Sequence, residues 1–243
     1  MTDRVETDKL TITPPAPDAA PEQEPVEAKV STFRLVATLA VAGILAGILI
    51  ALVNQHTHPI IEAYRAEQLR KAVYEVLPGV ARYDTYYLVD GALQLALPQG
   101  AKEGDFKRAY VGYDEAGQTK GVALSRGESG FQDIILVIFG FDPAAGTLSG
   151  MKVLESKETP GLGDKIEKNV DFVSQFDGVQ APLTGVKPRQ STGDPHEVDM
   201  ITGATISSRT VIKIINNALQ RMGPMLESYQ AAATGPQSAE VAQ

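Results

Sequence analysis

The segment Asp199-Met200-Ile201-Thr202-Gly203-Ala204-Thr205 ends a short β-prone run and leads directly into an amphipathic helix. Thr205, Ser207 and Ser208 are residue types that cap the start of a helix. The pair Gly223-Pro224 is expected to end it. The helix is predicted because apolar residues recur at helical spacing and form one stripe: Val211, Ile214, Ile215, Ala218, Leu219 and Met222.

This junction between strand and helix has the properties of a phosphate site. The first N–H groups of a helix have no partner within it, and the helix dipole is positive at that end. Gly203 and Ala204 have almost no side chain, so an anion can approach the backbone closely. Arg209 in the first turn could pair with that anion. The same sequence is also typical of an ordinary well-capped helix, so the spacing alone leaves both interpretations open.

Composition excludes several kinds of site. The chain has no cysteine, which excludes cysteine-ligated iron–sulfur clusters, thioether-linked haem and disulfides. Its three histidines, His56, His58 and His196, are not expected to converge on a metal. There is no Walker loop and no G-x-G-x-x-G motif. The net charge of −8 gives nucleic-acid binding no electrostatic support.

A membrane span is the second strong feature of the sequence. The run from Leu35 to Val53 contains no charged residue and is rich in leucine, isoleucine, valine and alanine. At about 1.5 Å per residue it nearly crosses a hydrocarbon core of about 30 Å. It is longer than the apolar core of a signal peptide, and no small-x-small cleavage site follows it. We therefore expect an uncleaved anchor.

The sequence does not decide the orientation of that span, or whether the span packs against a second helix. Basic residues flank both ends, so the positive-inside count leaves the orientation open. Gly43 and Gly47 form a G-x-x-x-G pattern that lets two helices approach closely. Glycine is also common in membrane helices that have no partner, so both interpretations of this pattern remain.

The chain is predicted to divide into four parts. Residues 1–32 are rich in proline and acidic residues and should be disordered. Residues 33–54 form the transmembrane helix, and residues 55–228 are long enough for one domain with its own core. Residues 229–243 are expected to be a flexible tail.

Within the domain, runs of strands occur together with a few helices, which predicts an α+β fold with an antiparallel-rich sheet and flanking helices. Ile134–Phe141 is almost continuously apolar, as in a central strand buried on both faces. Two helices are predicted, Pro59–Val76 with Ile61, Tyr64, Leu69, Val73 and Val76 inward, and Lys165–Phe176 with Ile166, Val170, Val173 and Phe176 inward. The remaining predicted strands are Thr85–Val89 and Ala92–Ala96 around Asp90-Gly91, Phe106–Tyr113, Gly121–Ser125, Thr147–Leu154 and Val198–Ile201.

The segment Thr159-Pro160-Gly161-Leu162-Gly163 lies between the Thr147–Leu154 strand and the helix after it. Two glycines and a proline can build a rigid turn whose backbone lies close to a flat ligand. An ordinary strand-to-helix connection is the alternative for this segment alone.

Taken together, the two motifs resemble a known family. The pair formed by Thr159-Pro160-Gly161-Leu162-Gly163 and the later Asp199-x-x-Thr202-Gly203-Ala204-Thr205 is similar to the covalent-FMN subunits of two related respiratory complexes. These are the G subunit of the Rnf electron transport complex and the C subunit of the sodium-pumping NADH:quinone oxidoreductase. The resemblance covers residues 33 to about 226. The continuation Gly163-Asp164-Lys165-Ile166-Glu167 is more similar to the Rnf protein.

The resemblance implies a role for each motif. Thr205 matches the threonine whose hydroxyl is esterified to the FMN phosphate by a separate flavin transferase, which uses FAD and a divalent metal. Asp199, Gly203 and Ala204 match positions that the transferase reads, and Thr202 stands where many relatives have serine. The turn formed by Thr159, Pro160, Gly161, Leu162 and Gly163 matches the segment that lies against the isoalloxazine ring. Lys165 is a candidate partner for the flavin.

The expected function is that of a membrane-anchored electron carrier. The resemblance implies covalent FMN, relay of electrons between ferredoxin and NAD through iron–sulfur and flavin partner subunits, and coupling to ion translocation. It also implies a single pass through the cytoplasmic membrane with the domain on the outer face. No general acid, base or nucleophile constellation is evident, so no independent substrate turnover is expected. The alternatives are the quinone-reductase C subunit and a non-catalytic, membrane-anchored binding or assembly module.

Overall fold

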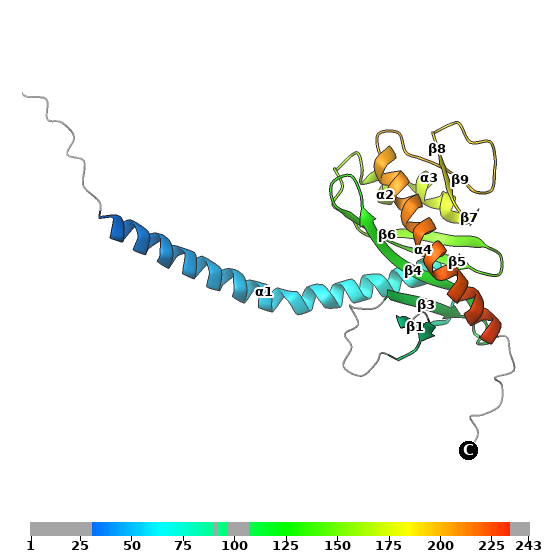
Figure 1. Cartoon of the computed structure of the whole chain (residues 1–243), viewed down its shortest axis with the longest axis horizontal. Helices are drawn as coiled ribbons and strands as arrows, with labels where there is room; N and C mark the ends of the chain where they lie inside the picture. Colours follow the sequence, from blue (N-terminus) through cyan, green and yellow to red (C-terminus); the bar gives the residue numbers. More distant parts are fainter. Residues whose placement is uncertain (1–30, 90–91, 97–106, 234–243) are drawn as a thin grey trace, which may run out of the picture. The chain divides into compact units, whose positions relative to one another are not determined.

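The computed structural model describes residues 31–89, 92–96 and 107–233 (Figure 1). The chain divides into two units, residues 1–57 and 58–243. Helix α1 (Thr32–Val76) begins in the first unit and ends in the second. The second unit contains all the strands and the remaining helices of the described part.

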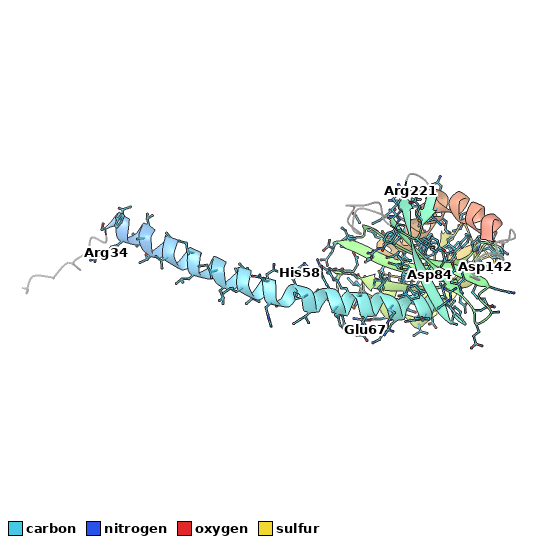
Figure 2. The ribbon with its side chains drawn as sticks, turned by 90° about the horizontal axis from the view of Figure 1, so that it is seen from below. Arg34, His58, Glu67, Asp84, Asp142 and Arg221 are labelled. Atoms are coloured by element: carbon cyan, nitrogen blue, oxygen red, sulfur yellow. The ribbon has the colours of Figure 1, made fainter. Side chains whose placement is uncertain are left out.

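Helix α1 contains a stretch that is long and apolar enough to cross a membrane. The side chains of this stretch are exposed, as Figure 2 shows for the part of α1 beyond Arg34. The predicted span and the predicted Pro59–Val76 helix are parts of this one helix, which continues through Pro59. A proline inside a helix removes one backbone hydrogen bond and costs about 3 kcal/mol, yet α1 is continuous across Pro59. Two residues predicted to face inward, Ile61 and Tyr64, are exposed.

An antiparallel seven-stranded sheet forms the centre of the second unit, in the order β2-β1-β3-β4-β5-β6-β7. A separate parallel pair, β8-β9, lies outside it. The predicted α+β class, with an antiparallel-rich sheet and flanking helices, is confirmed. The strands are β1 (Arg82–Val89), β2 (Ala92–Gln94), β3 (Lys107–Tyr113), β4 (Thr119–Ser129), β5 (Ile134–Asp142), β6 (Thr147–Glu155), β7 (Asp177–Gln180), β8 (Thr184–Val186) and β9 (Glu197–Asp199).

The predicted hairpins are present in the sheet. β1 pairs with β2, and Val89 lies opposite Ala92; the predicted turn residues Asp90 and Gly91 lie outside the described residues. β3 pairs with β4 as expected, while Phe106 also lies outside the described part. β4 extends to Ser129, beyond its predicted end at Ser125, because the whole of this segment pairs with β5.

The core lies on both faces of the sheet, and β5 is buried between them. On one face, Phe139 packs in a cluster with Ile214 and Ile215 of helix α4 (Thr205–Ala233). On the other face, Ile138 packs in a cluster with Val73 and Val76 of α1. Alternate side chains of a strand point to opposite faces, so this arrangement accounts for the continuous apolar run in the β5 sequence.

The predicted helix Lys165–Phe176 differs from the one observed. It consists of three short pieces, α2 (Lys165–Lys168), α3 (Val170–Val173) and the 3-10 turn η2 (Ser174–Phe176). Asn169 separates the first two, because its side chain accepts a hydrogen bond from Phe172 N at 3.0 Å and caps α3. Because α3 starts anew after Asn169, its side chains face other directions than in one continuous helix. Val170, predicted to be inward, is 77% exposed, and Phe172 is buried instead.

Helix α4 begins at Thr205, one of the residues predicted to cap its start, but it does not end at Gly223-Pro224 as predicted. It continues to Ala233. Its predicted apolar stripe is correct: Val211, Ile214, Ile215, Ala218 and Met222 are buried, and Leu219 packs against them. The stripe places α4 across β4 and β5, and this packing fixes the position of its first turn.

Candidate functional site

The start of α4 is held by the small parallel pair β8-β9. Met200 N donates a hydrogen bond to Val186 O at 2.9 Å, and Met200 and Ile201 are both buried. Gly203 then turns the chain with a φ of +83°. L side chains rarely adopt that conformation, so glycine is strongly favoured at this junction. The sequence motif therefore builds a rigid entry into α4.

Ser208 makes shorter hydrogen bonds to the backbone at this entry than Thr205 does. Its Oγ accepts a hydrogen bond from Ile201 N at 3.2 Å and donates one to Ala204 O at 2.9 Å. Thr205 Oγ1 lies 3.5 Å from Ile201 O, which is long for a hydrogen bond. Within the described part of the chain, the N–H groups of Thr205, Ile206 and Ser207 form no hydrogen bond. A weakly bonded hydroxyl and three free donors therefore lie together at the positive end of a long helix.

The turn Thr159–Gly163 packs against this entry. Leu162 N donates to Thr159 O at 3.1 Å and closes the turn. A β-carbon built on Gly203 would lie 3.7 Å from Leu162 Cδ2, so Leu162 lies over the backbone of Gly203. A β-carbon on Gly163 would lie 2.6 Å from Glu158 Oε2 and 3.0 Å from Ser207 Oγ. Only glycine allows the turn and the helix to approach this closely.

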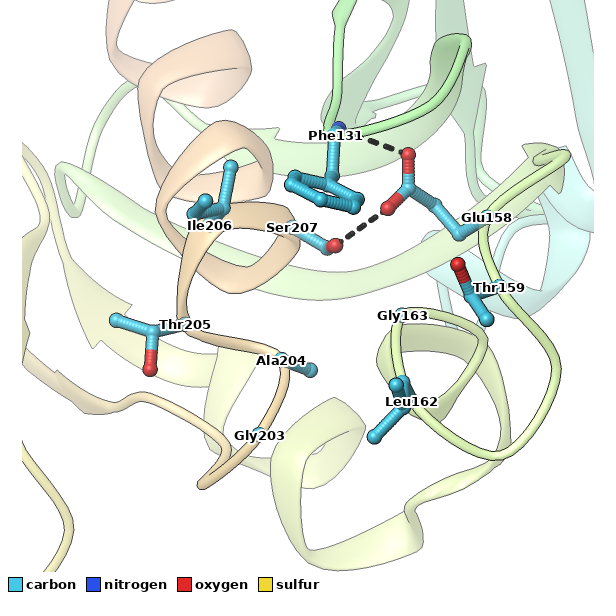
Figure 3. A pocket seen from close by; sticks show the side chains of 10 residues that line it. All are labelled: Phe131, Glu158, Thr159, Leu162, Gly163, Gly203, Ala204, Thr205, Ile206 and Ser207. Carbon is cyan, nitrogen blue, oxygen red and sulfur yellow. Dashed lines mark hydrogen bonds between the residues drawn. The ribbon is translucent and has the colours of Figure 1, made fainter.

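A pocket of about 330 Å³ lies where the turn and the helix entry meet (Figure 3). Three apolar side chains on its rim are largely exposed: Phe131 at 66%, and Leu162 and Ile206 at 50% each. The complete lining is Phe131, Glu158, Thr159, Leu162, Gly163, Gly203, Ala204, Thr205, Ile206 and Ser207.

Glu158 is the charged residue in the pocket lining. It is only 6% exposed. Its Oε1 accepts hydrogen bonds from Phe131 N at 2.9 Å and Gln132 N at 3.0 Å, and its Oε2 accepts one from Ser207 Oγ at 2.6 Å. Burial by itself would raise the pKa of this carboxyl, but the hydrogen bonds from Ser207 and from backbone N–H groups favour the ionised form and leave the pKa lowered.

Known proteins are similar in sequence to this chain over most of its length. The G subunit of the ion-translocating oxidoreductase complex of Vibrio vulnificus is 32% identical over 192 residues, which cover 75% of this chain and 85% of the relative. The chain belongs to this G subunit family. The Methanosarcina acetivorans member is 28% identical over 76% of this chain and 92% of its own length. The resemblance to the Rnf protein is thereby confirmed.

Two further comparisons bear on the fold of the domain. Residues 130–220 match the FMN-binding domain family. The crystal structure of Shewanella oneidensis NqrC superposes with a TM-score of 0.57 over 68% of this chain and 99% of that one, at 20% identity. This member of the G subunit family therefore has the fold of NqrC.

Only some of the motif residues of this family member line the pocket. Six predicted residues line the pocket: Thr159, Leu162, Gly163, Gly203, Ala204 and Thr205. The other five, which are Pro160, Gly161, Lys165, Asp199 and Thr202, are not part of its lining.

Those five residues have identifiable positions. Pro160, Gly161 and Thr202 are exposed. Lys165 is the first residue of α2. Asp199 ends β9, where its backbone N–H donates to Gln175 Oε1 at 2.6 Å and its Oδ1 is buried without a hydrogen-bond partner in the described part of the chain.

Four lining residues were not predicted as site residues from the sequence: Phe131, Glu158, Ile206 and Ser207. Glu158, Ile206 and Ser207 lie next to the predicted motifs, so adjacency to them is the signal that could have indicated these three. Phe131 lies in the β4–β5 connection and is brought to the pocket only by the sheet. The short sequence around it contains no feature that indicates a site.

Proposed function

We propose that this chain carries FMN in the pocket described above, esterified through its phosphate to Thr205. As the G subunit of an ion-translocating complex, it would relay electrons between other subunits. The observation that carries the proposal is the convergence of the two motifs. The Thr159–Gly163 turn and the Gly203–Ser207 helix entry are separate in sequence, and they line one pocket.

The phosphate end of FMN fits the entry of α4. The N–H groups of Thr205, Ile206 and Ser207 are unpaired within the described part of the chain, and such donors bind phosphate oxygens at helix N-termini. Gly203 and Ala204 leave space beside them. Arg209, in the first turn, is exposed and available to offset the negative charge.

The flavin ring fits the apolar rim of the pocket. A flat aromatic ligand needs apolar surface on its faces, and Phe131, Leu162 and Ile206 present such surface at the mouth of the pocket. The volume of about 330 Å³ is within the range of small-molecule sites. The chain has no tryptophan, so these side chains provide the ring contacts available in the pocket.

The environment of Thr205 favours attachment by a separate transferase. A hydroxyl needs an adjacent base to become a nucleophile. Among the described residues, the hydrogen-bond partner of Thr205 Oγ1 is the carbonyl of Ile201, and Figure 3 shows the Thr205 side chain pointing away from Glu158. The described part of the chain therefore presents the hydroxyl but places no base beside it to activate it.

The role of the protein in electron transfer is to hold and tune the cofactor. FMN supplies both one-electron and two-electron chemistry when bound. The turn, the helix entry and the rim residues orient the ring and exclude water from one side of it. The exposed rim leaves the other side open for electron exchange with partner subunits. The apolar part of α1 anchors the chain in the membrane, and the domain is proposed to lie on the outer face.

The proposal is tested by acid precipitation of the protein, purified from a host that contains the flavin transferase. A flavin that remains with the denatured polypeptide supports covalent attachment. A flavin released into the supernatant contradicts the phosphoester, and the absence of any flavin favours a binding or assembly module. Co-purifying subunits distinguish an Rnf-type complex from a quinone reductase.

A further inference from the structure

Glu158 joins three segments that are distant in sequence. Through Oε1 it binds the N–H groups of Phe131 and Gln132 in the β4–β5 connection. Through Oε2 it binds the hydroxyl of Ser207 in the first turn of α4. Its own backbone leads into the Thr159–Gly163 turn. Figure 3 shows the carboxylate between Phe131 and Ser207.

The space around this carboxylate is closed on two sides by glycines. A β-carbon on Gly130 would lie 2.5 Å from Glu158 Oε1, and one on Gly163 would lie 2.6 Å from Oε2. Real β-carbons do not approach other atoms this closely, so the two glycines form a slot that fits the carboxylate. A side chain held by three hydrogen bonds in such a slot has a fixed position.

We propose that Glu158 is a positioning residue for the flavin pocket, which holds the β4–β5 connection, the Thr159–Gly163 turn and the start of α4 together and places a fixed negative charge beside the ring. The part of this inference that concerns the flavin rests on the proposed function. The part that concerns the three segments does not, because it follows from contacts within the protein alone.

The charge has a direct consequence for reduction of the cofactor. Reduction adds negative charge to the ring system, and a nearby carboxylate in a buried setting opposes that addition. The ionised state of Glu158 is favoured by its hydrogen bonds, as described above. Glu158 therefore lowers the reduction potential of the bound flavin, in addition to shaping the pocket.

The first experiment measures the three-segment contact without flavin. The full chain is produced in a host that lacks the transferase, and amide hydrogen exchange is followed at Phe131 and Gln132. Glu158→Ala should accelerate exchange at both amides by about tenfold or more, because their acceptor is lost. Glu158→Gln keeps one acceptor oxygen and should leave most of the protection. Unchanged exchange in Glu158→Ala overturns the positioning role.

The second experiment measures the charge in the flavin-loaded protein. Glu158→Gln removes the charge while keeping the shape of the side chain, so the flavin midpoint potential should rise and the visible spectrum should shift. The matched control is Glu128→Gln, a partly buried carboxylate on β4 that pairs with Lys213 of α4 at 3.0 Å and does not line the pocket. The control should leave both quantities unchanged.

The outcomes separate this inference from the proposed function. If the unmodified protein retains no flavin, the proposed function fails, and the exchange experiment alone decides the positioning role. If flavin is retained and Glu158→Gln changes its potential no more than Glu128→Gln does, the effect of the charge is rejected while the proposed function stands.

Discussion

The hydroxyl of Ser208 accepts a hydrogen bond from the backbone N–H of Ile201 at 3.2 Å, across the junction between β9 and α4. Both residues are buried. This contact stabilises the entry into the helix and leaves Thr205, in the same turn, without a strong hydrogen bond of its own. The hydroxyl that stabilises the junction and the hydroxyl proposed to carry the flavin therefore belong to different residues of one helical turn.

Ser208→Ala should lower the stability of the protein by about 1–2 kcal/mol, because the buried N–H of Ile201 would lose its acceptor. Thermal unfolding of the flavin-free chain in detergent measures the effect. Ser174→Ala, at a serine of η2 with an exposed hydroxyl contact, is the control and should change stability much less. Equal effects of the two substitutions would show that Ser208 does not stabilise the junction.

Gly163→Ala should disturb the pocket more than Gly161→Ala. A methyl group at Gly163 would meet Glu158 and Ser207, whereas one at Gly161 would meet no atom within 4 Å. Gly161 has a φ of +77°, so its substitution still introduces backbone strain of about 1 kcal/mol. The flavin spectrum and midpoint potential, compared at similar flavin content, distinguish the two variants. A larger spectral change for Gly161→Ala would place the ring against the outside of the turn.

The elements that were predicted correctly from sequence are those whose pattern reflects one dominant cause. Burial on both faces makes β5 apolar throughout, and burial on one face gives α4 its stripe. The predicted helix Lys165–Phe176 is wrong because two causes compete in this segment. Its apolar spacing favours one helix, but the side chain of Asn169 binds a backbone N–H and starts a new one.

The pocket residues that lie in short clusters of glycine and hydroxyl residues could be predicted from the sequence. The pocket residues that are brought there by contacts between distant segments could not. Thr205 and Gly203 are recognisable in a short segment. Phe131 reaches the pocket through the pairing of β4 with β5, and the role of Glu158 depends on contacts with residues far away in sequence. A carboxylate in a loop normally indicates a solvated side chain, so its burial could be learned only from the structure.

Acidification should reduce the stability of the protein through Glu158. The pKa of this group in the folded protein lies below its ordinary value of 4.5. Burial acts to raise it, and the hydrogen bonds from Ser207 and the backbone outweigh that effect. The stabilisation is therefore fully present above pH ~4.5 and is lost as the pH falls through the lower folded-state pKa.

Comparison with Glu158→Gln isolates this contribution, because the other carboxylates titrate in both proteins. The stability difference between the parent and the variant should shrink as the pH is lowered from about 7 to below about 4. Thermal or denaturant unfolding of the flavin-free proteins measures it. A difference that stays constant or grows on acidification would contradict an ionised Glu158 in the folded state.

The domain after α1 should be on the outer side of the cytoplasmic membrane. The apolar stretch of α1 is long enough for a single membrane crossing, and the charged residues that flank it do not decide its direction. Protease added to right-side-out vesicles should therefore digest the chain beyond Val53 and leave the N-terminal segment protected. Digestion restricted to the segment before α1 would show the opposite orientation. Vesicles opened with detergent provide the control in which both sides are cut.

Thr205→Val should abolish flavin attachment without unfolding the protein. Valine keeps the shape of threonine and removes the one hydroxyl that the proposed phosphoester requires. The cost to folding should be below about 1 kcal/mol, since Thr205 Oγ1 makes only a 3.5 Å contact with Ile201 O. Intact-mass measurement of protein from a host with the transferase should show the FMN adduct on the parent chain and none on the variant.

Thr202→Ser is the matched control for this substitution, because it changes an exposed threonine of the same motif, outside the pocket lining, to the serine expected in many relatives. This control should keep its covalent flavin, and peptide mapping of the parent should place the adduct on Thr205. Thr205→Ser restores a hydroxyl at the same position and should recover at least part of the attachment. An adduct that persists on Thr205→Val, or that maps to Thr202 or Ser207 in the parent, would assign the phosphoester to another hydroxyl.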